Sequence, residues 1–134
     1  MSPTISHLLQ RTRTIAVVGI SDRPARPSHF VSQYMQHAGY RIIPVNPRYD
    51  TVLGVPCWPD LASIPESVDM VNVFRPSADT PPIARQAVAI GAQSLWLQQG
   101  IFNAEAEKIA LDAGLQVVMD RCLKVEHAGW RRNA

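Results

Sequence analysis

Residues 14–28 read TIAVVGISDRPARPS, and this stretch decides how the rest of the chain is interpreted. Its first part is an apolar, β-branched run that ends at Gly19, which is typical of a buried strand. A polar turn rich in arginine and proline follows, and the chain then enters a helical pattern. A strand, a glycine-containing turn and a helix in this order indicate the first unit of a nucleotide-binding α/β fold.

The length and composition of the chain limit the classes of protein it can belong to. With 134 residues and no second cluster of elements, we expect a single domain over residues 1–134. No apolar run approaches the roughly 20 residues of a membrane helix, and residues 1–13 lack the apolar core of a signal peptide. A net charge of +2 with scattered arginines gives no reason to expect nucleic acid as a partner. We therefore expect a cytoplasmic protein with no membrane or nucleic-acid partner.

Alternating strand and helix patterns continue along the chain. Apolar runs predict further strands at 41–47, 68–74, 93–97 and 115–120. Helical spacing and caps predict helices at 4–11, from Ser28 to His37, from Ser77 or Asp79 to Ile90, and from Asn103 to Ala113. Glycine and proline interrupt residues 48–65, so at most one helical turn is expected there.

This alternation predicts a doubly wound, five-stranded parallel sheet with helices on both faces. The strand order that we expect is 3-2-1-4-5. In such a sheet the ligand crevice lies at the carboxyl ends of the strands, where the order reverses beside the first strand.

The turn after the first strand has the properties of an anion cradle. Gly19 allows the backbone to approach a phosphate closely, and Ser21 can donate its hydroxyl. Ser28 is expected to cap the following helix, whose free N–H groups would add donors. Arg26, in the same turn, could clamp an anion. A simple alternative is that Gly19 only permits a tight turn and Ser28 only caps a helix.

The usual dinucleotide signature is absent from this turn. The later glycines of a GxGxxG motif are missing, and the second strand ends in Asn46-Pro47-Arg48, without the acidic residue that holds a ribose hydroxyl. A cation at this position suits an additional phosphate on the adenosine ribose, as in NADP or coenzyme A. The alternative for Arg48 is an arginine that only faces solvent.

Five segments of the chain are distinctive when they are taken together. They are VVGIS at 17–21 with Pro27-Ser28, GY at 39–40 leading to PVNP at 44–47, VFR at 73–75, WLQQGI at 96–101, and VMDRC at 118–122. From about Ile5 to Glu126 the chain resembles the small stand-alone CoA-binding proteins, whose domain is similar to the Rossmann domain of the succinyl-CoA synthetase α subunit.

The resemblance implies a Rossmann-like fold in which CoA lies across the strand ends. Its diphosphate would lie over the Gly19–Ser28 turn, its adenosine near residues 46–48 and 74–75, and its pantetheine near Gln98. The candidate binding residues are Gly19, Ile20, Ser21, Arg26, Ser28, Asn46, Pro47, Arg48, Phe74, Arg75 and Gln98. For Arg75 a salt bridge to Asp79 is an equal alternative.

No arrangement of residues in the sequence specifies a catalytic or metal site. The four histidines are not grouped with each other or with carboxylates, and Cys57 and Cys122 do not form a CxxC pair. We therefore predict non-catalytic binding of coenzyme A or an acyl-CoA. The alternatives are an NADP-dependent reductase and a protein-interaction module with a vestigial nucleotide pocket. The sequence leaves open a homodimer or an unidentified protein partner.

Overall fold

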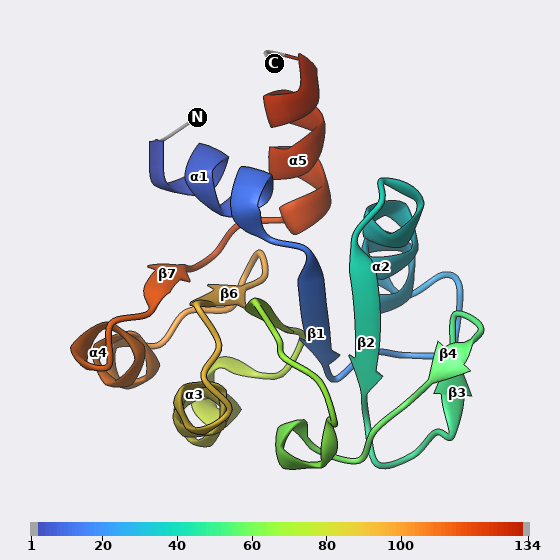
Figure 1. The fold of residues 1–134 in the computed structure, drawn as a ribbon, viewed down its shortest axis with the longest axis horizontal. Coiled ribbons are helices and arrows are strands. Elements are labelled where there is room, and N and C mark those ends of the chain that lie inside the picture. Colours follow the sequence, from blue (N-terminus) through green and yellow to red (C-terminus); the bar gives the residue numbers. More distant parts are fainter. Residues whose placement is uncertain (1–2, 133–134) are drawn as a thin grey trace.

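A five-stranded sheet lies between two layers of helices in the computed structural model, which describes residues 3–132 (Figure 1). Every pairing in this sheet is parallel. The strands are β1 (Thr14–Val18), β2 (Arg41–Val45), β5 (Met70–Val73), β6 (Ser94–Leu97) and β7 (Gln116–Val118). The predicted Rossmann-like α/β class, with a parallel sheet and helices on both faces, is confirmed.

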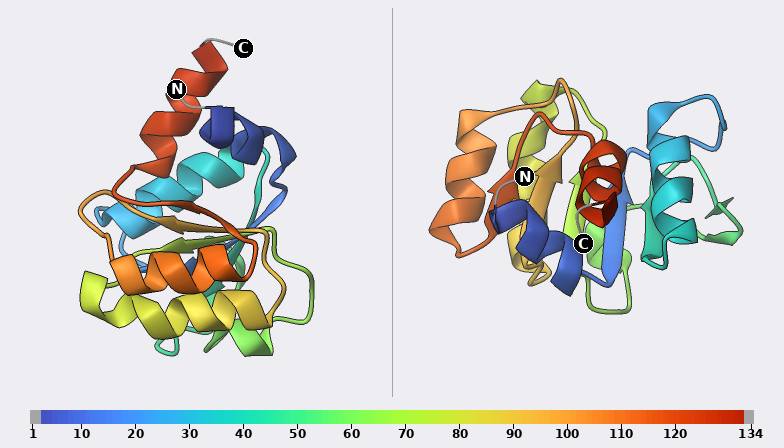
Figure 2. Two further views of the ribbon diagram at one scale, coloured as in Figure 1. Left: turned by 90° about the vertical axis from the view of Figure 1, so that its left-hand side faces the viewer. Right: turned by 90° about the horizontal axis from the view of Figure 1, so that it is seen from above.

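The remaining elements cover the sheet or extend from its edge. The helices are α1 (Pro3–Arg11), α2 (Pro27–His37), α3 (Thr80–Ala89), α4 (Ala104–Asp112) and α5 (Leu123–Arg132), with single helical turns η1 (Leu61–Ser63) and η2 (Ser77–Asp79). A small antiparallel hairpin consists of β3 (Thr51–Val52) and β4 (Val55–Pro56). Helices α3 and α4 cover one face of the sheet, and α1, α2 and α5 lie on the other (Figure 2).

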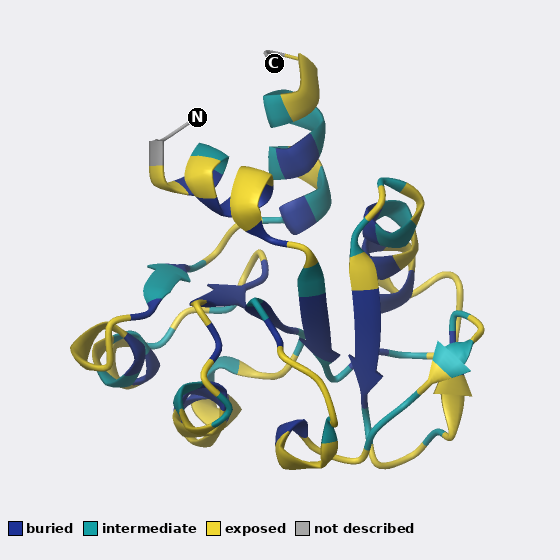
Figure 3. Ribbon diagram, in the orientation of Figure 1, coloured by how far each residue is buried: buried dark blue, intermediate teal, exposed yellow. Residues whose placement is uncertain are grey.

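The two helical layers are held by side chains that alternate along each strand. In β1, Ala16 packs towards the layer of α3 and α4, whereas Ile15 and Val17 pack towards α1, α2 and α5. The central strands are buried on both faces (Figure 3). This explains why strands in a covered parallel sheet read as continuous apolar runs.

The order of the strands is β2-β1-β5-β6-β7. The switch point therefore lies between β1 and β5, beside the first strand as expected. An isolated parallel bridge joins Val45 to Trp58 at the outer edge of β2. If this bridge is counted as a rudimentary third strand, the order becomes 3-2-1-4-5-6, which contains the expected 3-2-1-4-5 pattern. The strand at 68–74, which we expected beyond β2, instead pairs with β1 as β5.

Several local predictions differ from the structure. Helix α2 begins at Pro27, and its N-cap position is Arg26, so Ser28 is not the cap. At the start of α3, neither Ser77 nor Asp79 caps with its side chain, because η2 supplies a preceding turn. Helix α5 and the β3–β4 hairpin were not predicted. Asn103 does cap α4, accepting a hydrogen bond from the N–H of Ala106.

Candidate functional site

The turn after β1 brings the backbone of two neighbouring strands unusually close. Gly19 has a φ of +85°, and a Cβ atom at this position would lie 2.5 Å from the carbonyl oxygen of Phe74 and 2.9 Å from Cδ of Arg75. The Gly19 N–H donates to the carbonyl of Val45 on the other side. Only glycine fits a position with this φ and this close a neighbour. Because Gly19 has no side chain, its backbone stays uncovered above the strand ends.

Hydrogen bonds within residues 20–28 fix the shape of the turn. The N–H of Ser21 donates to Oγ of Ser28 at 2.9 Å, and the N–H of Arg23 donates to Oγ of Ser21 at 3.1 Å. The backbone N–H groups of Ile20, Asp22 and Ser28 have no hydrogen-bond partner among residues 3–132. Free N–H groups at the start of a helix are the donors that phosphate groups use.

The end of β2 is fastened to this turn through Asn46. Its Nδ2 donates to the carbonyl of Ile20 at 2.9 Å, and its Oδ1 accepts from the N–H of Arg48 at 2.9 Å. The Cys57 thiol donates to the Asn46 carbonyl, and burial raises the pKa of this thiol above its usual value. Asn46 therefore organises the backbone from which Arg48 extends, rather than offering its own amide to a ligand.

A cleft of about 740 Å³ lies above these strand ends, and we call it the arginine-lined cleft. Four arginines line it: Arg23 and Arg26 from the turn, Arg48 from the end of β2, and Arg75 from the end of β5. Sites for small molecules and cofactors usually have volumes of roughly 300–1,000 Å³. The volume of this cleft lies within that range. The arrangement is suited to an extended ligand with several negative charges.

Arg75 already has a carboxylate partner in this cleft. Its Nη2 lies 2.9 Å from Oδ2 of Asp79, and about half of each side chain is exposed. The salt bridge that we considered as an alternative role for Arg75 is therefore present. Ion pairs as exposed as this one contribute little free energy, so an anionic ligand can compete for Arg75.

The structure brings together most of the predicted binding residues, but not all. Those that line the arginine-lined cleft are Gly19, Ile20, Ser21, Arg26, Asn46, Pro47, Arg48 and Arg75. Ser28 is buried under the turn and Phe74 contributes its backbone, so neither side chain is part of the wall. Gln98 is buried deeper: it donates to Oδ1 of Asn72 at 2.8 Å and accepts from the N–H of Leu123 at 3.4 Å.

Several lining residues were missed by the sequence analysis, and two of them carry polar side chains from one segment. Tyr49 and Asp60 line the cleft from the irregular segment after β2. Asp60 accepts hydrogen bonds from the N–H and the hydroxyl of Ser63 and so caps η1. The only signal for Asp60 in the sequence was the capping pattern Asp-Leu-Ala-Ser at 60–63. This pattern predicts a helical turn but does not predict that the turn lies beside the cleft. Among residues 3–132, no cluster of histidine, cysteine and carboxylate side chains is placed to hold a metal ion.

A glycine turn with free N–H groups and converging arginines at the switch point of a parallel sheet are features of a nucleotide-binding α/β protein. More specifically, the chain belongs to the CoA binding domain family, whose model matches residues 13–128. It is 49% identical over 124 residues to the protein YneT of Bacillus subtilis, covering 92% of each chain.

Other similarities extend to larger proteins and to solved structures. The chain is 28% identical to the ADP-forming acetate-CoA ligase II of Archaeoglobus fulgidus, but spans only 15% of that protein's length and aligns over 72% of its own. A hypothetical protein of Pyrococcus horikoshii has the same fold, with a TM-score of 0.92 and 38% identity, covering 95% of this chain and 89% of that one. A protein of Thermus thermophilus has a TM-score of 0.88 and 39% identity, with coverage of 92% and 94%.

Proposed function

We propose that this chain binds coenzyme A or an acyl-CoA in the arginine-lined cleft and does not itself transform the ligand. The observation that carries the proposal is the convergence of the Gly19 turn, with its free N–H groups, and four arginines on one cleft. Membership of the CoA binding domain family supports the same ligand. CoA carries negative charge at two places, its diphosphate and its 3′-phosphate. The cleft offers two separate groups of donors for them, one in the turn at residues 19–28 and one at the end of β2.

In this proposal the diphosphate lies over residues 19–28 and the 3′-phosphate lies at Arg48. Arg26 and the N–H groups of the turn would neutralise the diphosphate, while Arg75 would exchange Asp79 for a ligand oxygen. Charge-assisted hydrogen bonds of about 1.5–3 kcal/mol each can supply the roughly −8 kcal/mol of a micromolar complex after ordering costs. Gln98, which is buried, would position the strand ends and the start of α5 rather than touch pantetheine.

The chemistry of the cleft walls supports binding without reaction. None of the described residues that line the cleft is a histidine or a cysteine. Of its two carboxylates, Asp60 is held as the cap of η1, whereas Asp79 pairs with Arg75 and would be released when Arg75 binds the ligand. General acid–base catalysis needs a titratable group within hydrogen-bond reach of the reacting atom. Besides the four arginines and these two carboxylates, the described lining offers only the phenol of Tyr49.

Calorimetric titration with CoA, dephospho-CoA and NADP tests the proposal. We expect micromolar affinity for CoA, weaker affinity for dephospho-CoA, and no hydride transfer from NADPH to a panel of carbonyl compounds. If millimolar CoA produces neither heat nor a thermal shift, the proposal fails. NADP binding with hydride transfer would instead establish a reductase. A stable dimer that binds neither nucleotide would establish a protein-interaction module.

Mass spectrometry of small molecules that co-purify with the protein gives an independent reading. A bound CoA thioester would identify the acyl group directly. A co-purifying nicotinamide nucleotide would contradict the assignment of the ligand class.

A further inference from the structure

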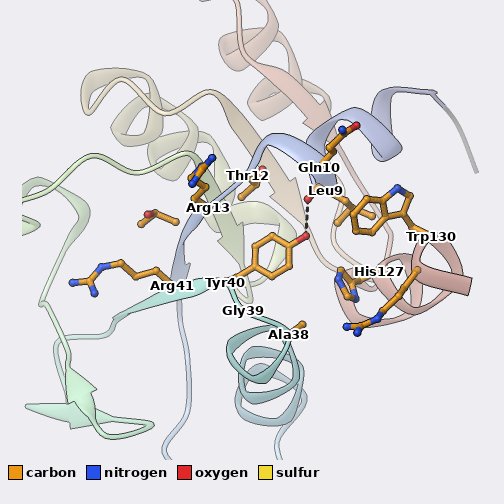
Figure 4. A pocket seen from close by; sticks show the side chains of 12 residues that line it. Leu9, Gln10, Thr12, Arg13, Ala38, Gly39, Tyr40, Arg41, His127 and Trp130 are labelled. Atoms are coloured by element: carbon orange, nitrogen blue, oxygen red, sulfur yellow. Dashed lines mark hydrogen bonds between the residues drawn. The ribbon is translucent and has the colours of Figure 1, made fainter. Parts of the chain in front are cut away.

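A second pocket lies at the opposite end of the sheet, at the amino ends of β1 and β2 (Figure 4). Its volume is about 610 Å³. We call it the aromatic pocket, and its central lining residues are Leu9, Thr12, Arg13, Tyr40, His127 and Trp130. These residues come from α1, the start of β1, the start of β2 and α5. The pocket therefore shares no residue with the arginine-lined cleft.

The walls of the aromatic pocket are held by contacts between rings. The ring of His127 meets Tyr40 at a centroid distance of 5.5 Å and Trp130 at 5.5 Å, edge to face in both cases. The Tyr40 hydroxyl donates to the carbonyl of Leu9 at 2.6 Å, as Figure 4 shows. Flat apolar surfaces in fixed positions are suited to a planar ligand, because little side-chain entropy is lost on binding.

Two polar side chains of this pocket have hydrogen-bonding groups that no protein atom uses and that are accessible from the pocket. Thr12 is only 7% exposed, and its hydroxyl has no hydrogen-bond partner among residues 3–132. His127 is 3% exposed; its Nδ1 is paired with the Tyr34 hydroxyl at 2.9 Å, whereas its Nε2 has no partner in the same range. Because neither atom is enclosed by protein, both are available to a ligand that enters the pocket. When Tyr34 donates to Nδ1, both Thr12 and Nε2 of His127 can donate to an acceptor in the pocket.

The charge of the lining is positive. Three arginines line the pocket and no carboxylate does. Arg41 is paired with Glu66, but the guanidinium groups of Arg13 and Arg131 have no carboxylate partner within the described chain. The backbone N–H of Arg13 donates to the Asp69 carboxylate at 3.0 Å. The carboxyl ends of α1 and α2 add partial negative charge, although this effect fades within one turn. The two unpaired guanidinium groups therefore dominate, and they favour an anion.

We propose that the aromatic pocket binds a planar aromatic carboxylate. Its ring would lie against Tyr40, Trp130 and Leu9, and its carboxylate would accept from Arg13 or Arg131 and from the donors of Thr12 and His127. The proposal is independent of the proposed function, since it concerns different residues at the other end of the sheet.

Binding of 2-naphthoate, followed by calorimetry and by the indole N–H signal of Trp130 in NMR spectra, tests the proposal. The variant Trp130→Phe assigns that signal. We expect saturable binding of 2-naphthoate and a shift of the Trp130 signal in protein already saturated with CoA. The uncharged 2-naphthamide should bind at least about tenfold more weakly, because it loses a charge-assisted hydrogen bond. Inorganic phosphate, which has no ring, should not shift the signal.

Paired variants separate this pocket from non-specific binding. Removing both unpaired charges with Arg13→Gln and Arg131→Gln should weaken 2-naphthoate at least about tenfold. The control variant Arg132→Gln matches the Arg131 change, because it removes one charge from the same helix at a position that does not line the pocket, and it should leave affinity unchanged. Equal affinity for naphthoate and naphthamide, or naphthoate binding that CoA displaces, would overturn the proposal. Failure of CoA to bind would leave it untouched and contradict only the proposed function.

Discussion

Gly19 carries two separate constraints, and substitution shows which of them matters. A Cβ atom added at Gly19 would meet the Phe74 carbonyl at 2.5 Å in addition to adopting a φ of +85°. Gly114 has a similar φ of +88° but nothing within 4 Å of the added atom. We expect Gly114→Ala to lower the free energy of unfolding by about 1 kcal/mol, and Gly19→Ala to lower it by about 2–3 kcal/mol.

Urea denaturation of the two alanine variants measures this difference. Gly19→Ala should also abolish CoA binding, whereas Gly114→Ala should keep it. Equal destabilisation of the two variants would mean that the backbone around Phe74 moves aside and that the close approach is not required.

Arg48 is the residue on which discrimination for the 3′-phosphate should depend. It lies at the end of β2, and its N–H is anchored by Asn46. Wild type should prefer CoA to dephospho-CoA by about tenfold, the value of one charge-assisted hydrogen bond. Arg48→Ala should bind the two ligands equally. An unchanged preference in calorimetric titration would place the 3′-phosphate elsewhere.

At the scale of elements, Gln98 connects the sheet to α5. Its side chain joins Asn72 on β5 to the first N–H of α5 at Leu123, and it is 4% exposed. Gln98→Ala leaves two buried polar groups unsatisfied and should lower the free energy of unfolding by about 2–3 kcal/mol. The exposed neighbour Gln99→Ala should change it by less than about 0.5 kcal/mol. A small effect at Gln98, measured by urea denaturation, would argue that the network is dispensable.

The contact of α5 with α2 should respond to acid through His127. Burial, and secondly Arg131, lower the pKa of His127 below its usual value near 6.5. Below pH 6.5 the imidazole of His127 binds a proton more readily in the unfolded chain than in the folded protein. The free energy of unfolding is therefore fully retained above pH 6.5 and decreases as the pH falls below it. Wild type should therefore lose unfolding free energy between about pH 7.5 and 5.5 more steeply than His127→Phe.

Urea denaturation across this pH range compares the slopes, so a general destabilisation of His127→Phe does not affect the test. The matched variant His37→Phe changes an exposed histidine and leaves the His127 ring contacts intact. Parallel slopes for wild type and His127→Phe would contradict the prediction.

The elements that the sequence predicted correctly are those with strong local patterns. Residues 14–18 form a continuous apolar run, and Asn103 is a capping residue before a helix, so both were located well. Helix α5 was missed because Gly129 and several charges hide its pattern, although Leu123, His127 and Trp130 have helical spacing. The β3–β4 hairpin was missed because its turn places Leu53 at a φ of +55°, which a leucine rarely adopts.

The position of β5 and the role of Ser28 depend on contacts distant in sequence. No pattern within residues 68–74 states which neighbour this strand pairs with, and the single bridge at Trp58 that occupies the outer edge has no strand pattern. Ser28 has the residue type of a cap, but its hydroxyl is used by the N–H of Ser21 across the turn. Eight of the eleven candidate binding residues line the cleft, because strand ends converge in any parallel sheet.

For the molecule as a whole, ligand binding and stability should be linked. At a CoA concentration of 100 times the dissociation constant, binding adds about 2.7 kcal/mol to the free energy of unfolding. The midpoint temperature of thermal unfolding should therefore rise by several degrees. Because the contacts are ionic and partly exposed, this rise should shrink in high salt. A rise that is independent of salt would contradict recognition by arginines.

Across residues 3–132, no helix is both long and apolar enough to cross a membrane.

Both edges of the sheet are poor templates for another strand. Along β2 the outward-facing groups at Pro44 and Asn46 already bond to Trp58, and proline has no N–H to offer. The opposite edge, β7, spans only Gln116–Val118. Short or blocked edges protect proteins from joining edge to edge. The chain should therefore resist aggregation at high concentration, and any pairing of two copies should occur between helical faces and leave the sheets separate.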